Sequence, residues 1–332
     1  MSDWSLTMPG RFDEAIVYSI DMRMHFRGVD HREGMLLRRG DRWTEWSPFL
    51  EYGDPEAAVW LAASLIDEEP PRHRTRIPVN VTVPVVSPRR AADLVASSGC
   101  STAKVKIADP HSCLDDDLAR LAVVRSVLGP DGELRVDANG GMSVEAAERA
   151  LTLMAPLRLQ YAEQPCATVE ELVELRKRLA EAGVAVPIAA DESIRRAEDP
   201  LRVAELGAAD VVVLKNQPLG GWRRCLELSE QLDLPVVMSS ALETSIGIWA
   251  GAQAAAALPN LDLACGLNTV KMLDDDVVAD SLVARGGFLE LTGPPVPDRA
   301  ALARARAGRE RNTWWRARLA RCLRILDLKQ AA

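Results

Sequence analysis

The chain has 332 residues, of which 48% are hydrophobic and 27% are charged, a composition typical of globular proteins with a large core. Its formal net charge of −8 argues against nucleic acid or an anionic membrane as the main partner. No apolar run approaches the ~20 residues that span a bilayer, and the six cysteines form no CxxC pair. We therefore expect reduced thiols, no zinc site and, because the N-terminus carries no secretory leader pattern, a cytoplasmic location.

The first 86 residues predict a small domain of antiparallel strands and one helix. The runs at 14–26 and 34–49 read as strands, and the second run contains a Gly-Asp turn. A helix is expected over 55–69, followed by a Pro-containing linker at 68–74.

From about residue 87 to residue 284, short apolar runs alternate with longer amphipathic segments. The predicted strands lie at 79–84, 102–107, 133–138, 157–165, 186–193, 210–216, 234–240 and 261–267. Positions near their ends (106, 137, 163, 191, 215 and 239) recur every 24 to 31 residues, which predicts an α/β fold with a closed parallel barrel. The alternative, an open doubly wound sheet, requires a Gly-rich turn after its first strand, and the sequence "VPVVSPRR" has none.

After residue 285 the βα rhythm stops. The sequence "TWWRARLARCLRIL" predicts an amphipathic helix, with Trp315, Leu319 and Leu323 on one face at i+4 spacing. We expect this helix to pack on the N-terminal region and to complete an α+β capping domain, rather than to anchor the chain to a membrane. The predicted division is a capping domain at 1–86, a barrel at 87–284 and a C-terminal segment at 285–332 that returns to the cap.

Charged side chains end consecutive strands of the predicted barrel, where burial makes a charge least expected. These residues are Lys104, Lys106, Asp137, Glu163, Asp191 and Lys215. One such residue is equally well explained by a structural ion pair. Six of them in matched positions predict a site, because catalysis in parallel barrels takes place where the strands end.

Three of these residues are carboxylates on neighbouring strands, which are hard oxygen ligands suited to Mg²⁺, with Mn²⁺ as an alternative. Lysines flank them. A lysine is an effective base when its pKa falls toward neutrality, and a like charge such as Lys104 beside Lys106, together with a nearby cation, lowers it. Removal of a proton α to a carboxylate is then feasible, because the metal stabilises the enediolate.

The same residues resemble the motifs of the enolase superfamily, in its muconate-lactonising subgroup, and most closely those of the o-succinylbenzoate synthase family of the actinobacterial type. "KVK" matches the K-x-K motif, and "VDANG", "AEQPC" and "AADES" match the three metal-ligand motifs. "VVVLKN" matches the segment that carries the opposing lysine. The resemblance implies a (β/α)7β modified TIM barrel. It also implies catalytic roles for Lys104, Lys106 and Lys215, and metal ligation by Asp137, Glu163 and Asp191.

Further matches imply substrate contacts and supporting residues. "MSSALETSIG" resembles the segment in which Ser239 or Ser240 contacts the substrate, and "CGLNT" the loop whose backbone N–H near Gly266 holds a succinyl carboxylate. Asn139, Glu192 and Arg135, which flank or precede the ligands, are expected to support them. An ion pair inside the barrel explains Arg135 equally well, and ordinary loop hydrogen bonding explains Asn139 and Glu192 equally well.

The reaction implied by the resemblance is a hydro-lyase step of menaquinone biosynthesis. In it, 2-succinyl-6-hydroxy-2,4-cyclohexadiene-1-carboxylate loses water to give 2-succinylbenzoate. Lys106 would take the α-proton, and Lys215 would stay protonated and stabilise the enediolate. The expected partner is therefore a small-molecule carboxylate, with no nucleic acid and no membrane, and the sequence leaves open whether the protein is a monomer or a homo-oligomer.

Three other readings remain at this point. The same six residues would serve an N-succinylamino acid racemase or a dipeptide epimerase. A Schiff-base aldolase would use a lysine such as Lys215, but the three carboxylates would then have no purpose. A catalytically inactive scaffold is the third reading, and the intact set of bases and ligands argues against it.

Overall fold

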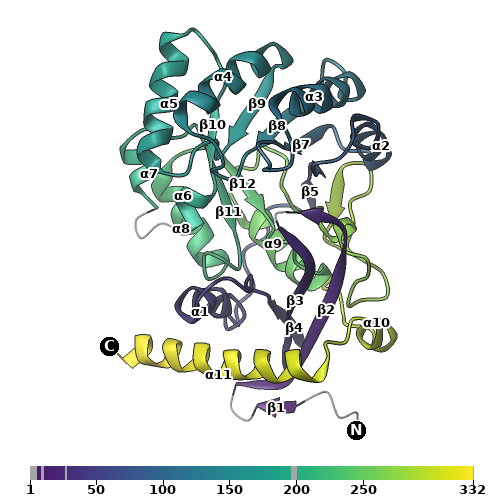
Figure 1. Ribbon diagram of the computed structural model, residues 1–332. Helices are drawn as coiled ribbons and strands as arrows, with labels where there is room; N and C mark the ends of the chain where they lie inside the picture. Colours follow the sequence, from purple (N-terminus) through teal and green to yellow (C-terminus); the bar gives the residue numbers. More distant parts are fainter. Residues whose placement is uncertain (1–5, 9–10, 27, 196–199, 332) are drawn as a thin grey trace.

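The computed structural model describes residues 6–8, 11–26, 28–195 and 200–331, arranged as a parallel barrel above a smaller α+β cap (Figure 1). The strands of the cap form an antiparallel sheet in the order β1 (Leu6–Met8), β2 (Phe12–Phe26), β3 (Val29–Arg39) and β4 (Arg42–Trp46). The β3–β4 hairpin turns at Gly40, whose φ of +58° suits glycine. The predicted Gly-Asp turn is therefore confirmed.

Seven parallel strands form the wall of the barrel, each hydrogen-bonded to the next along the chain. They are β6 (Val81–Val83), β7 (Thr102–Lys106), β8 (Glu133–Asp137), β9 (Leu159–Glu163), β10 (Ile188–Ala190), β11 (Val211–Lys215) and β12 (Val236–Ser239). Parallel bridges from Ser239 to Gly266 and from Val79 to Cys265 close the ring. The predicted (β/α)7β barrel is confirmed, and its eighth strand is shorter than the expected 261–267.

Helices follow the strands in turn. They are α2 (Pro88–Ser98), α3 (Leu114–Leu128), α4 (Val144–Met154), α5 (Val169–Glu181), α6 (Glu192–Arg195), α7 (Arg202–Glu205), α8 (Trp222–Leu232) and α9 (Ser245–Ala257). Two short 3₁₀ turns are also present: η1 (Ala155–Leu157) follows α4, and η2 (Val270–Met272) comes after α9. Ser143 and Thr168 begin α4 and α5 as N-caps, each accepting a backbone N–H of the first turn.

The chain leaves the barrel and returns to the cap. On the way, β13 (Phe288–Glu290) pairs with β5 (Arg76–Pro78), and α10 (Arg299–Arg304) leads into α11 (Arg309–Ala331). The last helix lies along α1 (Asp54–Ala63) and β2 (Figure 1). Trp315, Leu319 and Leu323 are buried in the core of the cap. Among the helices in the described part of the chain, none has the length and apolar character required to cross a membrane.

Candidate active site

The six charged residues singled out in the sequence all lie at one mouth of the barrel. Lys106 ends β7, Asp137 ends β8 and Glu163 ends β9, and the parallel register places these three side by side. Asp191 directly follows β10, and Lys215 ends β11. All six side chains, Lys104 included, belong to residues that are at most 9% exposed.

Each carboxylate is bound by a lysine. Lys106 Nζ lies 2.6 Å from Asp137 Oδ2, and Lys215 Nζ lies 2.5 Å from Asp191 Oδ2. Lys104 Nζ donates to both oxygens of Glu163, at 2.8 and 2.9 Å, and lies 3.1 Å from Asp137 Oδ2. Because three ammonium groups face three carboxylates, the buried cluster is close to neutral, as a buried ionic group requires.

The three carboxylates are hard oxygen donors that suit a divalent cation. In this structure their oxygens bind the ammonium groups of the lysines. Within the described ranges, no three Asp, Glu, His or Cys side chains are grouped as the ligands of one metal ion. The chemistry of the donors is nevertheless that of a magnesium site, since three buried carboxylates stand at the ends of adjacent strands.

The pKa values within the cluster are shifted by burial and by the close spacing of its charged groups. Burial and the neighbouring Asp137 carboxylate raise the pKa of Glu163 to about 7. Burial also raises the pKa of Asp137, but the charges of Lys106 and Lys104 outweigh it and hold that pKa well below its usual range. For Lys104, burial lowers the pKa, yet Glu163 and Asp137 together raise it well above the ordinary value. Lys104 is thus bound to two carboxylates. The sequence had predicted a different role, in which the positive charge of Lys104 lowers the pKa of the lysine beside it.

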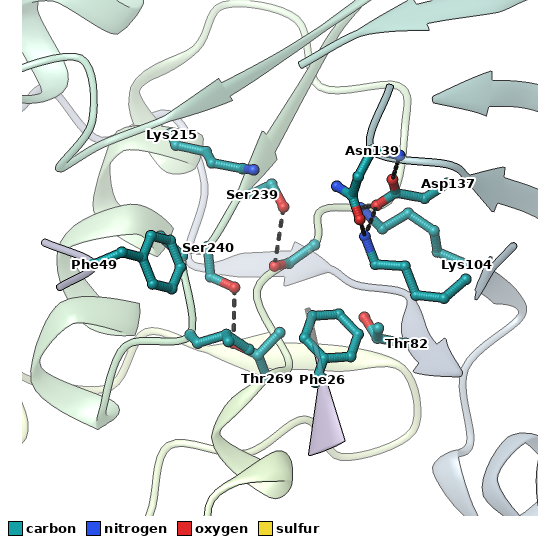
Figure 2. Close-up of a pocket in the computed structure, with 14 residues that line it drawn as sticks. Phe26, Phe49, Thr82, Lys104, Asp137, Asn139, Lys215, Ser239, Ser240 and Thr269 are labelled. Atoms are coloured by element: carbon teal, nitrogen blue, oxygen red, sulfur yellow. Dashed lines mark hydrogen bonds and ion pairs between the residues drawn. The ribbon is translucent and has the colours of Figure 1, made fainter. Parts of the chain in front are cut away.

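A cavity of about 40 Å³ lies between this cluster and the cap (Figure 2). Lys104, Asp137 and Asn139 lie on one side of it in Figure 2, and Phe49 and Ser240 lie on another. Its volume is that of roughly one or two water molecules. Entry of an organic molecule of several heavy atoms therefore requires pocket side chains to move.

Six lining residues were not singled out from the sequence, and two of them, Ala241 and Leu242, follow β12. Thr82 is on β6, Thr269 follows the closing bridge, and Phe26 and Phe49 come from the cap. Thr269 bonds Ser240 through their hydroxyls at 2.7 Å, and the Phe26 ring lies 5.2 Å from Lys106 Nζ. Thr82 and Thr269 were within reach of sequence reasoning because they lie at or near the ends of predicted strands. Phe49 gave no such signal, since only the tertiary fold brings this part of the cap to the barrel.

Gly266 is one of the residues that line the cavity. Its backbone N–H donates to Met238 O at 2.8 Å, because this bond closes the barrel. The Gly266 N–H is therefore engaged within the barrel, and the expectation that a backbone N–H near Gly266 holds a carboxylate stays a prediction. A Cβ at this position would meet the Ser239 side chain, so a larger residue requires the Ser239 hydroxyl to rotate away.

The three expected supporting residues separate into two groups. Asn139 Oδ1 accepts from Lys106 Nζ at 2.5 Å, and its Nδ2 donates to Glu192 at 3.3 Å, so both residues stand beside the carboxylate cluster. Arg135 lies deeper in the barrel, where its guanidinium donates to Gln160 Oε1 and Ala264 O. Its hydrogen bonds therefore brace the interior of the barrel and do not hold a carboxylate of the cluster.

One supporting residue was missed. Arg195 is buried beside Asp191, to which its Nε donates at 3.2 Å, and it also donates to Glu192 at 2.5 Å. Its third partner is the hydroxyl of Tyr52 in the cap, at 2.8 Å. This contact spans 143 residues of sequence, so no local pattern predicts it.

Known proteins match the chain over both domains. The family model for the enolase C-terminal domain-like fold matches residues 87–299, and the enolase N-terminal domain-like model matches residues 17–67. An o-succinylbenzoate synthase of Thermobifida fusca is 54% identical over 82% of this chain and 85% of its own length. One of Mycobacterium marinum is 46% identical over 96% of both chains. The chain belongs to the o-succinylbenzoate synthase family of the enolase superfamily.

Solved structures agree with the fold of this family. A muconate lactonizing enzyme from Pseudomonas fluorescens superposes with a TM-score of 0.74 at 22% identity, covering 88% of this chain and 98% of its own. The L-Ala-D/L-Glu epimerase from Bacillus subtilis gives 0.69 at 22% identity, covering 85% and 96%. At these identities the likeness shows the shared barrel and cap, not a shared reaction.

Proposed function

We propose that this chain dehydrates 2-succinyl-6-hydroxy-2,4-cyclohexadiene-1-carboxylate to 2-succinylbenzoate, with Mg²⁺ as its metal ion. The observation that carries the proposal is the set of three lysines and three carboxylates at one barrel mouth, in a chain 46% identical over 96% of its length to an o-succinylbenzoate synthase. Enzymes of this superfamily combine a lysine base with magnesium.

Lys106 is proposed as the base that removes the α-proton of the substrate. Its Nζ is held by Asp137 and Asn139 and faces the cavity. The same ammonium can then return the proton to the departing hydroxyl, so that one water leaves and the ring becomes aromatic. This use of one residue for both proton transfers corresponds to syn elimination.

Lys215 is proposed to stay protonated and to stabilise negative charge on the substrate carboxylate. It comes from β11, four strands away from the β7 that carries Lys106, and it also lines the cavity. Asp137, Glu163 and Asp191 would hold a divalent cation, which supplies positive charge for the same carboxylate. For the lysines to act, their ammonium groups must release these three carboxylates.

Substrate contacts are proposed for Ser239 and Ser240, whose hydroxyls face the cavity beside Thr269. We further propose the cytoplasm as the compartment, because all six cysteines are free. The proposed domains are a cap at 1–86, a barrel at 87–284 and a segment at 285–332 that rejoins the cap.

The proposal is tested by following formation of 2-succinylbenzoate by ultraviolet absorbance. We expect turnover with Mg²⁺, loss after EDTA, and recovery when Mg²⁺ or Mn²⁺ is added back. Absence of product would overturn the proposal. So would activity that resists EDTA together with borohydride trapping of substrate on Lys215, because that result identifies a Schiff-base enzyme.

Racemisation on the same scaffold is separated by a second assay. N-succinyl-phenylalanine is incubated with the enzyme in D₂O, and exchange of its α-proton is followed by NMR. Dehydration without exchange is the expected result, and exchange faster than dehydration would instead assign the site to a racemase.

A further inference from the structure

The loop between β12 and α9 forms part of the cavity wall. Ser239, Ser240, Ala241 and Leu242 all line the cavity. Leu242 has a φ of +63°, a left-handed conformation that is unfavourable for a residue with a bulky side chain. A loop of this kind keeps its shape only where its surroundings hold it.

Arg32 of the cap donates hydrogen bonds to this loop. It lies on β3 and is 2% exposed. Its Nε donates to Leu242 O at 3.1 Å, and its Nη2 donates to Ala241 O at 3.1 Å and to Ser47 O at 2.6 Å. The three acceptors are backbone carbonyls, two in the barrel loop and one in the cap.

The same guanidinium also stacks on a cap residue that lines the cavity. Its central carbon is 4.5 Å from the centroid of the Phe49 ring, and Phe49 lines the cavity from the cap. Arg32 therefore touches the barrel wall through hydrogen bonds and the cap wall through stacking, a combination that guanidinium chemistry allows and ammonium chemistry does not.

A second cap residue fixes the far end of the loop. Glu45, on β4, accepts from the backbone N–H groups of Thr244 at 3.1 Å and Gly247 at 3.0 Å, at the start of α9. A carboxylate is favourable at a helix N-terminus. The close approach also depends on Gly247, since a Cβ there would lie 3.0 Å from a Glu45 oxygen. The loop is thus bound to the cap at both of its ends.

We infer that Arg32 is a positioning residue that sets the spacing between Phe49 and the β12–α9 loop, and thereby the affinity for the succinyl-bearing substrate. The inference rests on the proposed function for the identity of the ligand. Arg32 donates to carbonyls of the cavity wall, whereas the proton transfers are assigned to Lys106 and Lys215. Its replacement should therefore weaken binding and leave the chemical step largely intact.

The test compares Arg32→Lys with Arg39→Lys. Arg39 is on the same strand and donates to Leu65 O and Asp67, which do not line the cavity. For Arg32→Lys we expect KM, and the Kd of 2-succinylbenzoate in a tryptophan-fluorescence titration, to rise about tenfold, the effect of losing one or two hydrogen bonds. The value of kcat per folded enzyme and the affinity for Mg²⁺ should stay within about threefold, a margin of ~0.7 kcal/mol. Arg39→Lys should behave as the wild type.

Two results would overturn the inference. One is an unchanged KM and product Kd in Arg32→Lys, and the other is a loss confined to kcat that follows the folded fraction measured by circular dichroism. If the wild type forms no 2-succinylbenzoate and does not bind it, the proposed function fails instead.

If no Arg32 variant folds, hydrogen exchange on the wild type tests the inference instead. Bound 2-succinylbenzoate should slow exchange in residues 240–244 and also in residues 29–35, the part of β3 that holds Arg32. Protection confined to 240–244 would contradict a coupling through Arg32.

Discussion

Lys104 and Lys106 stand two residues apart on a strand that is buried throughout, and each ammonium lies against carboxylates of the neighbouring strands. The sequence predicted both lysines on one side of β7, since alternate residues of a strand share a face. It did not show that Lys104 would bind Glu163 and Asp137 together. That arrangement depends on the side-by-side register of β7, β8 and β9, which only the folded barrel supplies.

Glu243 gives a pH-dependent prediction at the residue scale. Burial and the nearby Glu45 raise its pKa from 4.5 to about 7. The folded chain therefore keeps a proton that the unfolded chain loses between these values, so stability decreases as pH rises from 4.5 to 7. Glu243→Gln removes this dependence. Between pH 5 and pH 8, the wild type should lose up to ~3 kcal/mol of unfolding free energy relative to the variant.

Thermal unfolding of both proteins across this pH range checks the prediction. Because other titrating groups are common to both chains, they cancel in the difference between the two unfolding curves. A difference in Tm that is the same at pH 5 and pH 8 would show that the Glu243 carboxyl does not titrate as described.

At the scale of elements, the strands of the barrel were the most predictable feature. Seven of the eight apolar runs that were read as barrel strands contain an observed strand, because the interior of a parallel barrel demands β-branched residues at a regular βα repeat. The run at 261–267 is the exception. Only Cys265 and Gly266 form bridges there, and a Cβ at Gly266 would meet the Ser239 side chain.

Helix α11 was predicted from its spacing of apolar residues, and the structure gives it a measurable role. Trp315 is fully buried, meets the Trp46 ring edge-on at 5.3 Å and donates its indole N–H to Glu33 at 2.9 Å. Trp315→Ala should lower the unfolding free energy by about 3–5 kcal/mol, the usual loss for a buried aromatic residue. Urea unfolding followed by circular dichroism measures this loss.

The adjacent Trp314 is only partly buried and serves as the matched control. Trp314→Ala should cost less than half as much, because its ring keeps contact with solvent. Equal losses for the two variants would mean that the packing of α11 on the cap does not depend on the Trp315 face.

At the scale of the whole molecule, contacts between cap and barrel complete the site. Phe26 and Phe49 close the cavity, Arg32 and Glu45 hold the β12–α9 loop, and Tyr52 meets Arg195. Contacts such as Arg32 to Leu242 join residues 210 positions apart. A single sequence carries no local signal for such pairs, which is why the charged cluster could be predicted and these contacts between cap and barrel could not.

Binding of the metal ion should also be visible in the stability of the whole protein. A ligand that binds only the folded state stabilises it by ~2.7 kcal/mol at a hundred times its Kd. We expect Mg²⁺ to raise Tm in the wild type and in Glu181→Gln, an exposed control at the end of α5. Asp191→Asn should lose most of the rise, and an equal rise in all three proteins would place the ion elsewhere.

The central claim is that Lys106 is the base of a dehydration. Its most direct test is the initial rate of 2-succinylbenzoate formation by Lys106→Ala, at saturating Mg²⁺ and substrate. The account predicts a kcat about a thousandfold below that of the wild type, within the range expected for loss of a general base, with binding of 2-succinylbenzoate retained. A kcat within about tenfold of the wild type, below that range, would contradict the assignment.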